Sequence, residues 1–590
     1  MSLQKNAEEW DLTDIFKTED EFKESKKNIE NMLIEIEKFE GNLCDNSDNL
    51  YNCYMLYEKL LKEFEKVYSY GMFKYHLNMA DQDGIKKFKE VQELSSNITF
   101  KTAFIVTEIS YSDENKISKY LKEEKLQRYK REISEMLEKK KHILNKEEEK
   151  ILAKYQEIFS APENIFDILT NAEFKFGKIK LENDQEIEMT EATYTNFLKD
   201  KNVNIRRQAF NLMYKKYGEF INTISEIYLS NVKKTSITSS LRNYSSSLEK
   251  AVINDDSTLK VYEALMQGVN ESLEINHNFI KLKKDLLQKQ DFHMYDLYVN
   301  PFEGKKDEIS YEDAKKEVLD ALSILGENYV SKLQEAFNNN WIDVYEKSNK
   351  RGGAYSSGVY GVHPFVLMSF TNSKRDVSTI AHELGHSMHS YYSNSNQNIF
   401  DANYTIMVAE VASTVNEILL SEYQVNKEKD DRKKAEIIYE LLEMIRATFY
   451  RQSMFAEFEK IVHEKIENEE LMSSVDLNNI YYDLNKKYFG TSIIIDEEIK
   501  YEWARIPHFY TDFYVYKYAT GISAAIVIAS KILKKEQGYI DKYLKMLSMG
   551  ATKKSVDLLK MVDVDLENPL TYRETAEFFN NKIEKLKKII

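Results

Sequence analysis

DVSTIAHELGHSMHSYY, the stretch from Asp376 to Tyr392, places two histidines four residues apart with a glutamate beside the first. In an α-helix, residues i and i+4 lie one above the other on the same face, so His382 and His386 can direct their imidazoles at one ion. Glu383 is then close enough to reach a water molecule on that ion. The spacing predicts a zinc site on a helix, with Glu383 as the general base. We expect this helix to begin at Asp376, because aspartate favours the N-cap position.

A zinc site of this kind needs a third protein ligand, which we sought downstream of the histidines. At the spacings found in metzincins, aminopeptidases and thermolysin, the chain carries Tyr392, Thr405 and Ile406, none of which matches the ligand of those families. The first carboxylate on a new helical stretch is Glu410, within Asn403–Ser421. A carboxylate on an otherwise apolar face is costly to bury, and a cation held by a neighbouring helix removes that cost. We therefore predict Glu410 as the third ligand.

Two more side chains share the faces of the predicted ligands. Glu417 lies seven residues after Glu410, and two interpretations of it stay open: an acceptor for the N–H of a ligand histidine, or a member of an ordinary salt bridge. His389 lies seven residues after His382. We expect His389 to pack against its neighbours or to support the ligands, because catalytic zinc keeps one position free for water.

The composition indicates a helical protein of more than one lobe. Of 590 residues, only 5 are proline and 17 are glycine, whereas 31% are charged. So few helix breakers among so many good helix formers favour a mostly α-helical fold. Single cores stop growing at about 250–300 residues, so we expect two lobes. We divide the chain into an N-terminal helical region, residues 1–200, and a catalytic region, residues 201–590.

Charge, cysteine content and apolar runs restrict both the classes of molecule that the protein can bind and its location. The formal net charge of −16 argues against nucleic acid, which requires a basic surface. Cys44 and Cys53 are too few for a disulfide scaffold. The N-terminus lacks the apolar core of a signal peptide, and the longest apolar run, Ile522–Ala529, is far too short to span a bilayer. We expect a cytoplasmic protein without membrane partners. The oligomeric state stays undetermined, with a monomer favoured.

Two places break the helical pattern. Apolar and charged residues alternate across Phe176–Thr190, on either side of Asn183-Asp184, which predicts a β-hairpin near 176–190. The second break, Arg351–Thr371, holds four glycines within ten residues and ends in a short apolar run. We expect a flexible loop followed by a strand, Pro364–Thr371, just before the metal helix. As an edge strand, it would pair with an extended substrate.

At this point the sequence resembles the oligoendopeptidase F group of zinc metallopeptidases, relatives of thimet oligopeptidase and neurolysin. The resemblance rests on three blocks, AHELGHSMHSYYS (Ala381–Ser393), VAEVASTVNE (Val408–Glu417) and ARIPHFYTDFYVYKYATG (Ala504–Gly521). It implies a mainly α-helical, two-lobed, neurolysin-like zincin fold, with a deep substrate channel and a small β element beside the active site. It also implies a zinc-dependent endopeptidase that hydrolyses internal bonds of short oligopeptides.

The resemblance also assigns roles to single residues. It matches His382, His386 and Glu410 to the zinc ligands and Glu383 to the catalytic base, as the spacing does. In the relatives, a histidine and tyrosines after the zinc site face the substrate carbonyl, and His508 matches that histidine. Two tyrosines are candidates for the oxyanion side, Tyr516 as the preferred match and Tyr514 as the alternative. The glycine run that follows the catalytic histidine in thimet-type relatives is absent here.

Two rival functions stay open at the level of sequence. A metallocarboxypeptidase of similar helical fold would need a cation that binds the C-terminus of the substrate, and Arg505 is the candidate. A catalytically silent protein that binds zinc or peptides would not require Glu383, His508 and the tyrosines together. The three sequence blocks favour the endopeptidase.

Overall fold

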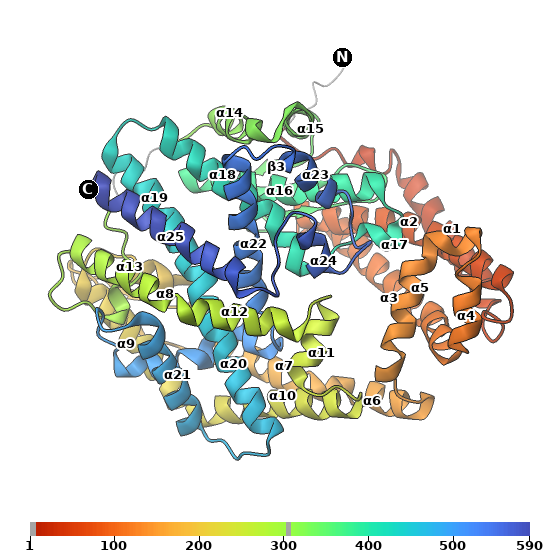
Figure 1. The fold of residues 1–590 in the computed structure, drawn as a ribbon, viewed down its shortest axis with the longest axis horizontal. Helices are drawn as coiled ribbons and strands as arrows, with labels where there is room; N and C mark the ends of the chain where they lie inside the picture. The colour runs from red at the N-terminus through yellow and green to blue at the C-terminus, as the bar shows by residue number, and fades with distance from the viewer. Residues whose placement is uncertain (1–7, 303–307) are drawn as a thin grey trace. The chain divides into compact units, whose positions relative to one another are not determined.

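The structure is a computed structural model that describes residues 8–302 and 308–590. Its described residues are mainly helical, with two small β-sheets (Figure 1), which confirms the predicted fold class. The chain forms two compact units. Unit 1 comprises Met1–Ile143, Lys306–Tyr423 and Ile528–Val564, and unit 2 comprises Leu144–Lys305, Gln424–Val527 and Asp565–Ile590.

Both units are assembled from separate stretches of the chain, so a single boundary at residue 200 does not separate them. The reason lies in the core of unit 1. Buried side chains from the first 140 residues pack in one cluster with side chains that immediately precede the metal helix. The ring centroids of Phe73 and Phe365 lie 4.9 Å apart, and those of Trp10 and Phe365 lie 5.8 Å apart. The N-terminal helices therefore support the segment that carries the metal motif.

Unit 1 contains the elements η1 Leu12–Asp14, α1 Glu19–Glu37, α2 Ser47–Leu77, α3 Gln82–Tyr111, α4 Glu114–Tyr120, η2 Glu124–Tyr129, α5 Lys130–Glu138, η3 Lys139–His142, α14 Tyr311–Leu322, η6 Ser323–Leu325, α15 Glu327–Asn338, β3 Ile342–Tyr345, β4 Tyr355–Ser357, β5 Phe365–Phe370, α16 Lys374–Asn396, α17 Ile399–Ala402, α23 Tyr539–Leu547 and α24 Ser555–Lys560. Two helices run from one unit into the other, α18 Ile406–Lys427 and α22 Tyr516–Leu533.

Unit 2 contains the elements α6 Lys146–Phe159, α7 Ala161–Asp167, η4 Ile168–Glu173, β1 Lys178–Lys180, β2 Glu186–Glu188, α8 Glu191–Leu198, α9 Val203–Glu219, α10 Ile221–Leu241, α11 Ser247–Asn254, α12 Leu259–Glu271, α13 Leu273–Leu286, η5 Met294–Asp296, α19 Asp431–Ile445, η7 Arg446–Arg451, α20 Gln452–Glu467, α21 Ser474–Phe489, η8 Glu497–Arg505, η9 Pro507–Tyr510 and α25 Pro569–Ile589. The β-hairpin predicted near 176–190 is confirmed as the antiparallel pair β1–β2.

A three-stranded sheet precedes the metal helix, and its order corrects one prediction. The predicted strand exists as β5, but it is not an edge strand: it lies in the centre, parallel to β3 and antiparallel to β4. The run FVLM within β5 is fully buried, as expected for a strand covered on both faces. The edge beside β5 is β4, a short strand within the glycine-rich segment, where a loop was expected.

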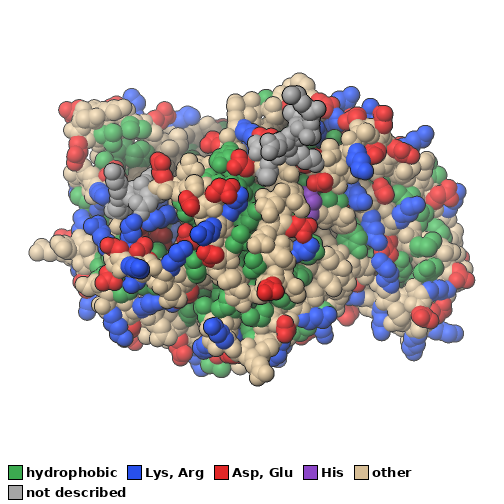
Figure 2. Space-filling view, turned by 90° about the horizontal axis from the view of Figure 1, so that it is seen from above, with side chains coloured by type: hydrophobic (Ala, Val, Ile, Leu, Met, Phe, Trp, Pro, Cys, Tyr) green, Lys and Arg blue, Asp and Glu red, His purple; other side chains and the backbone are tan. Residues whose placement is uncertain are grey.

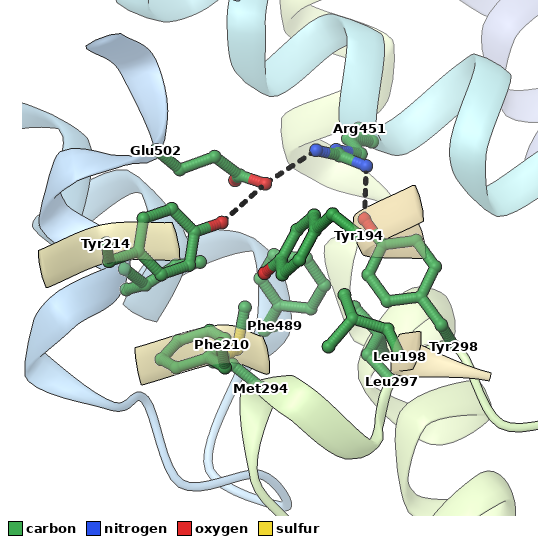
Figure 3. A pocket seen from close by; sticks show the side chains of 11 residues that line it. Tyr194, Leu198, Phe210, Tyr214, Met294, Leu297, Tyr298, Arg451, Phe489 and Glu502 are labelled. Atoms are coloured by element: carbon green, nitrogen blue, oxygen red, sulfur yellow. Dashed lines mark hydrogen bonds and ion pairs between the residues drawn. The ribbon is translucent and has the colours of Figure 1, made fainter. Parts of the chain in front are cut away.

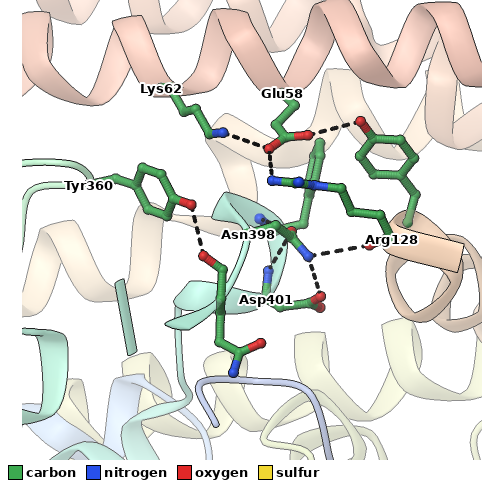
Figure 4. Close-up of polar contacts among 9 residues, drawn as sticks. Glu58, Lys62, Arg128, Tyr360, Asn398 and Asp401 are labelled. Atoms are coloured by element: carbon green, nitrogen blue, oxygen red, sulfur yellow. Dashed lines mark hydrogen bonds and ion pairs between the residues drawn. The ribbon is translucent and has the colours of Figure 1, made fainter. Parts of the chain in front are cut away.

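A polar network ties α17, just after the metal helix, to the N-terminal helices of unit 1 (Figure 4). Glu58 on α2 accepts hydrogen bonds from Arg128 and Tyr129. The amide of Asn398 donates to the backbone carbonyl of Arg128 and to the carboxylate of Asp401. These contacts connect α17, which follows the C-terminal end of the metal helix, to α2.

Three further features of the structure concern membrane-spanning helices, disulfide bonds and surface charge. Across the described ranges, no helix is long and apolar enough to cross a membrane. Cys44 and Cys53 are both buried and form no disulfide with each other. On the face drawn in Figure 2, basic and acidic side chains are interspersed.

Candidate metal centre

The helix that carries the metal motif is α16, and its capping differs from the expectation. The N-cap is Ser373, not Asp376, which occupies the third helical position. The Asp376 carboxylate accepts the backbone N–H of Ser373 at 3.0 Å and of Thr371 at 2.8 Å. An acidic residue in this position completes a capping box, because it satisfies N–H groups that the helix leaves free. The start of the helix moves, but the register of the histidines is unchanged.

The three predicted ligands converge within unit 1. The Nε2 atoms of His382 and His386 are 3.2 Å apart, and Oε2 of Glu410 lies 3.6 Å from the first and 3.8 Å from the second. Ligand atoms about 2.1 Å from one tetrahedral zinc ion are roughly 3.4 Å from one another. Among the described residues, these three form the group of histidine and acidic side chains that could hold a metal ion. The donor set therefore fits zinc.

A glycine explains why Glu410 on α18 can reach histidines on α16. A Cβ atom built on Gly385 would lie 2.5 Å from Cα of Ser413 and 2.7 Å from the backbone oxygen of Ala412. Any side chain at this position would therefore push the two helices apart. The glycine between Leu384 and His386 in the motif allows the close backbone approach that brings the third ligand to the imidazoles.

A buried hydrogen-bond chain fixes the same two helices at the adjacent turn. The amide of Asn416, fully buried on α18, donates to the backbone carbonyl of Ala381 at 3.0 Å. Its carbonyl oxygen accepts from the hydroxyl of Tyr329 on α15 at 3.1 Å. Since buried amides are costly to leave unpaired, this chain specifies the pairing of α16 with α18.

The second ring nitrogen of His382 is also engaged. Nδ1 of His382 lies 3.1 Å from Oε2 of Glu417, whose other oxygen accepts from the hydroxyl of Ser378. Such a partner fixes the tautomer of a ligand imidazole, so that Nε2 is left free for the metal. Of the two interpretations of Glu417, the geometry supports the hydrogen-bond acceptor.

The electrostatics of the cluster favour a cation and a base of near-neutral pKa. Burial acts to lower the pKa of His382, but the hydrogen bond and the charge of Glu417 raise it to about 9. Burial raises the pKa of Glu383 to about 7, opposed by the charge of His382 and assisted by Glu410 and Glu417. A carboxylate of this pKa can both accept and return a proton near neutral pH.

Comparison with known proteins accounts for this arrangement. The sequence profile of peptidase family M3 matches residues 196–578, and that of oligopeptidase F matches residues 108–176. The chain belongs to peptidase family M3. Oligopeptidase PepF of Bacillus subtilis is 36% identical over 99% of this chain and 88% of its own length. The crystal structure of oligoendopeptidase F from Enterococcus faecium is 30% identical, with a TM-score of 0.74 over 97% of this chain and 99% of its own.

A peptidase from Chlamydophila abortus has the same fold, with a TM-score of 0.92 and 28% identity over 99% of this chain and 98% of its own. These likenesses confirm the resemblance that the three sequence blocks indicated. The chain is an M3 metallopeptidase of the oligoendopeptidase F type.

His389 of this M3 peptidase packs beside the centre. Its ring stacks on that of Tyr404, with centroids 3.6 Å apart and planes 4° apart. It is almost fully buried, and burial lowers its pKa to about 3. The Tyr404 hydroxyl in turn is 2.9 Å from Oγ of Ser390. A neutral imidazole stacked on a tyrosine is a packing element, which is the first of the two roles expected for His389.

The third sequence block of the M3 peptidase lies in unit 2, where it forms an aromatic cluster. His508 is exposed, and its ring centroid is 5.8 Å from that of Tyr514 and 5.9 Å from that of Tyr518. The Tyr518 hydroxyl lies 3.5 Å from Nε2 of His508. Tyr518 was not singled out from the sequence, although its spacing of four residues from Tyr514 places both on one face of a helical stretch.

Tyr516, the preferred oxyanion candidate, does not share this cluster. Its side chain is completely buried within unit 2, and its hydroxyl donates to Oδ2 of Asp255 at 3.0 Å. Its ring packs on that of Tyr262, with centroids 5.3 Å apart. Two residues along a chain turn a side chain toward a different direction, which is why Tyr514 and Tyr516 have such different surroundings.

Arg505, the candidate of the carboxypeptidase rival, is already paired. Its Nε donates to Oε1 of Glu191 at 3.0 Å, and its guanidinium lies over the ring of Tyr194. Tyr194 also lines a small cavity in unit 2, in which Arg451 pairs with Glu502 (Figure 3). The cavity measures about 10 Å³, which is the space for one water molecule. These arginines stabilise a packed interior and offer no pocket for a peptide carboxylate.

Proposed function

We propose that this chain is a zinc-dependent endopeptidase that hydrolyses internal bonds of short oligopeptides and holds one zinc ion per chain. The observation that carries the proposal is the convergence of His382, His386 and Glu410 on one point, with Glu383 beside them. Two imidazoles and one carboxylate are ligands that zinc prefers, and three protein ligands leave a position for water. The relatives are named oligopeptidase and oligoendopeptidase, which supports the substrate class.

When bound, the zinc ion supplies a Lewis acid and lowers the pKa of a bound water to about 7. In our proposal Glu383 accepts the proton of the attacking water and later donates it to the leaving amine. Glu417 keeps the His382 ring in the orientation that presents Nε2. Glu383 stays buried next to the ligands, which excludes bulk water from the proton transfer.

We propose His508 as the oxyanion donor, on the strength of the third sequence block alone. His508, which is exposed, is the donor expected from the sequence, and its ring neighbours Tyr514 and Tyr518 are half-buried. Tyr516 is withdrawn as the preferred tyrosine, because its hydroxyl is buried and bonded to Asp255. Removing one oxyanion donor typically costs about 10²–10³ in rate, so His508→Ala and Tyr518→Phe should lower kcat by this order.

We also move the substrate-pairing role from β5 to β4. An extended peptide can add a strand only to an edge with free backbone groups, and β5 has partners on both sides. β4 (Tyr355–Ser357) pairs with β5 along one side and directly neighbours α16. An extended substrate paired with β4 would pass beside Glu383.

The test is the cleavage of a quenched peptide of about ten residues, with each product mapped by mass spectrometry. We expect hydrolysis at internal bonds, loss of activity with a chelator and recovery when zinc is returned. Cleavage confined to the last or the first bonds would favour an exopeptidase instead. Peptide binding without any cleavage would favour the silent binding protein.

A further inference from the structure

A histidine that is not part of the metal cluster contacts the edge strand β4. His76, almost fully buried near the end of α2, places Nδ1 2.8 Å from the hydroxyl of Tyr355, the first residue of β4. Its Nε2 lies 2.9 Å from Nη1 of Arg351. The backbone adds to the contact, because the N–H of Arg351 donates to the carbonyl of His76 at 2.9 Å. His76 thus joins α2 to the segment that leads into β4.

The hydrogen-bond partners of His76 determine the protonation state and the tautomer of its ring. A guanidinium has only N–H donors, so Nε2 of His76 must be the acceptor in its bond with Arg351. The proton of the neutral imidazole then resides on Nδ1, which donates to the Tyr355 hydroxyl. Burial and the charge of Arg351 both lower the pKa of His76, to about 4, which agrees with a neutral ring. The neutral His76 side chain is therefore hydrogen-bonded to Arg351 and Tyr355, the two ends of the segment that leads into β4.

β4 in turn contacts α16, the metal helix. Ser387 on α16 donates its hydroxyl to the backbone carbonyl of Glu383 at 3.0 Å. The hydroxyl of Ser356 lies 2.8 Å from that of Ser387, one turn further along α16. Next along the chain, a Cβ on Gly358 would approach Cβ of Ser390 to 2.8 Å, so the backbone packs directly on the helix. The position of β4 is therefore coupled to the turn of α16 that carries Glu383.

We infer that His76 is a positioning residue for the hydrolysis: through Tyr355 it fixes β4, and through the contact of β4 with Ser387 on α16 it sets the orientation of the Glu383 carboxylate. The inference rests on the proposed role of Glu383 as the base. A carboxylate rotated away from the attacking water loses alignment, and misplacements of about 1 Å can cost on the order of 10² in rate. His76 itself touches neither metal nor substrate.

The test compares zinc-loaded variants. His76→Leu removes both hydrogen bonds, Tyr355→Phe removes one, and His76→Gln keeps one donor and one acceptor in a side chain of similar reach. We expect His76→Leu to lower kcat by roughly tenfold to hundredfold with a much smaller change in KM, and His76→Gln to restore part of the loss. The double variant His76→Leu/Tyr355→Phe should be no slower than His76→Leu, because the two residues act in one chain.

The matched control is Tyr298→Phe in unit 2. Like Tyr355→Phe, it removes one tyrosine hydroxyl that is hydrogen-bonded to a side chain, here Arg451. Its kcat should stay within about twofold of the wild type. Zinc content should be unchanged in all variants, since none removes a ligand. Amide hydrogen exchange gives a readout independent of catalysis: residues 355–357 should exchange at least tenfold faster in His76→Leu, with α16 and unit 2 unaffected.

Two results would overturn the inference. One is a wild-type kcat in both His76→Leu and Tyr355→Phe, and the other is an increase of exchange throughout unit 1, which would make His76 a general stabiliser. Failure of the proposed function is a separate outcome. If Glu383→Gln cleaves peptides at the wild-type rate, the base itself is wrong, whatever the His76 variants do.

Discussion

Glu417 is a single residue behind the ligands, and its contribution can be measured directly. Its carboxylate accepts from Nδ1 of His382, which keeps the opposite nitrogen directed at His386 and Glu410. Removing such a partner typically lowers metal affinity by about 10–100-fold. We expect Glu417→Ala to show this loss in competition with a zinc chelator. Glu417→Gln retains an acceptor and should lose less. An unchanged affinity in Glu417→Ala would reduce the pair to an ordinary ion pair.

Glu65 predicts a pH dependence of stability. Burial raises its pKa from 4.5 to about 7, although it accepts the N–H of Tyr360 at 3.1 Å. Between these pH values the folded chain keeps a proton that the unfolded chain has lost, so stability falls as pH rises from about 4.5 to about 7 and then levels. Glu65→Gln cannot ionise, so its stability relative to the wild type should rise by roughly 2–3 kcal/mol between pH 5 and pH 8. An equal difference at both pH values in thermal unfolding would contradict this.

At the residue scale, prediction from sequence was strong where periodicity carried the information. Four-residue spacing placed His382 and His386 on one face, and the cost of an apolar-face carboxylate selected Glu410. Choosing between Tyr514 and Tyr516 required knowing which direction each side chain takes in an irregular turn. Phe513 there adopts a φ of 55°, a left-handed conformation that no spacing rule anticipates for phenylalanine.

Among the elements, the pairing of α16 with α18 depends on one glycine. A methyl group at Gly385 would overlap Ser413 and the carbonyl of Ala412, so Gly385→Ala must separate the helices. We expect loss of tight zinc binding and a destabilisation of about 1–3 kcal/mol, as for other overpacked sites. Gly352→Ala is the matched control, because a Cβ atom at that position would meet no atom within 4 Å. Wild-type zinc affinity in Gly385→Ala would show that the contact can relax.

The order of strands was beyond the sequence for a related reason. The hydrophobic run of β5 indicated a strand, but a run buried on both faces has neighbours that only the fold supplies. β4 has three residues, all half-buried, within a glycine-rich segment. So short an element has no periodicity to recognise, and its place at the edge follows from pairing with β5.

At the scale of the whole molecule, the interleaved units predict that the catalytic region cannot stand alone. A fragment of residues 201–590 would lack the N-terminal helices that cover Val359, Phe365 and Leu367. Exposing such buried side chains removes about 1.5–3 kcal/mol each. We expect this fragment to lose near-ultraviolet circular dichroism and zinc binding, with the full chain as the control. A fragment that binds one zinc ion and cleaves peptides would show that residues 201–590 fold independently, with a domain boundary at residue 200.

Composition and length gave the helical class and two lobes, both visible in the structure. The division into consecutive regions was not recoverable, because no linker composition marks the crossings. α18 and α22 pass from one unit to the other as uninterrupted helices. Helical periodicity continues through such a crossing, so sequence patterns alone cannot locate it.

The measurement that tests the central claim most directly is zinc per chain together with peptide turnover, in the wild type, Glu410→Ala and Glu383→Gln after chelation and reconstitution. We predict one zinc ion and full activity in the wild type. Glu410→Ala should lose both, whereas Glu383→Gln should keep the zinc and lose turnover. Stoichiometric, tightly bound zinc in Glu410→Ala, or near-normal hydrolysis by Glu383→Gln, would contradict the account.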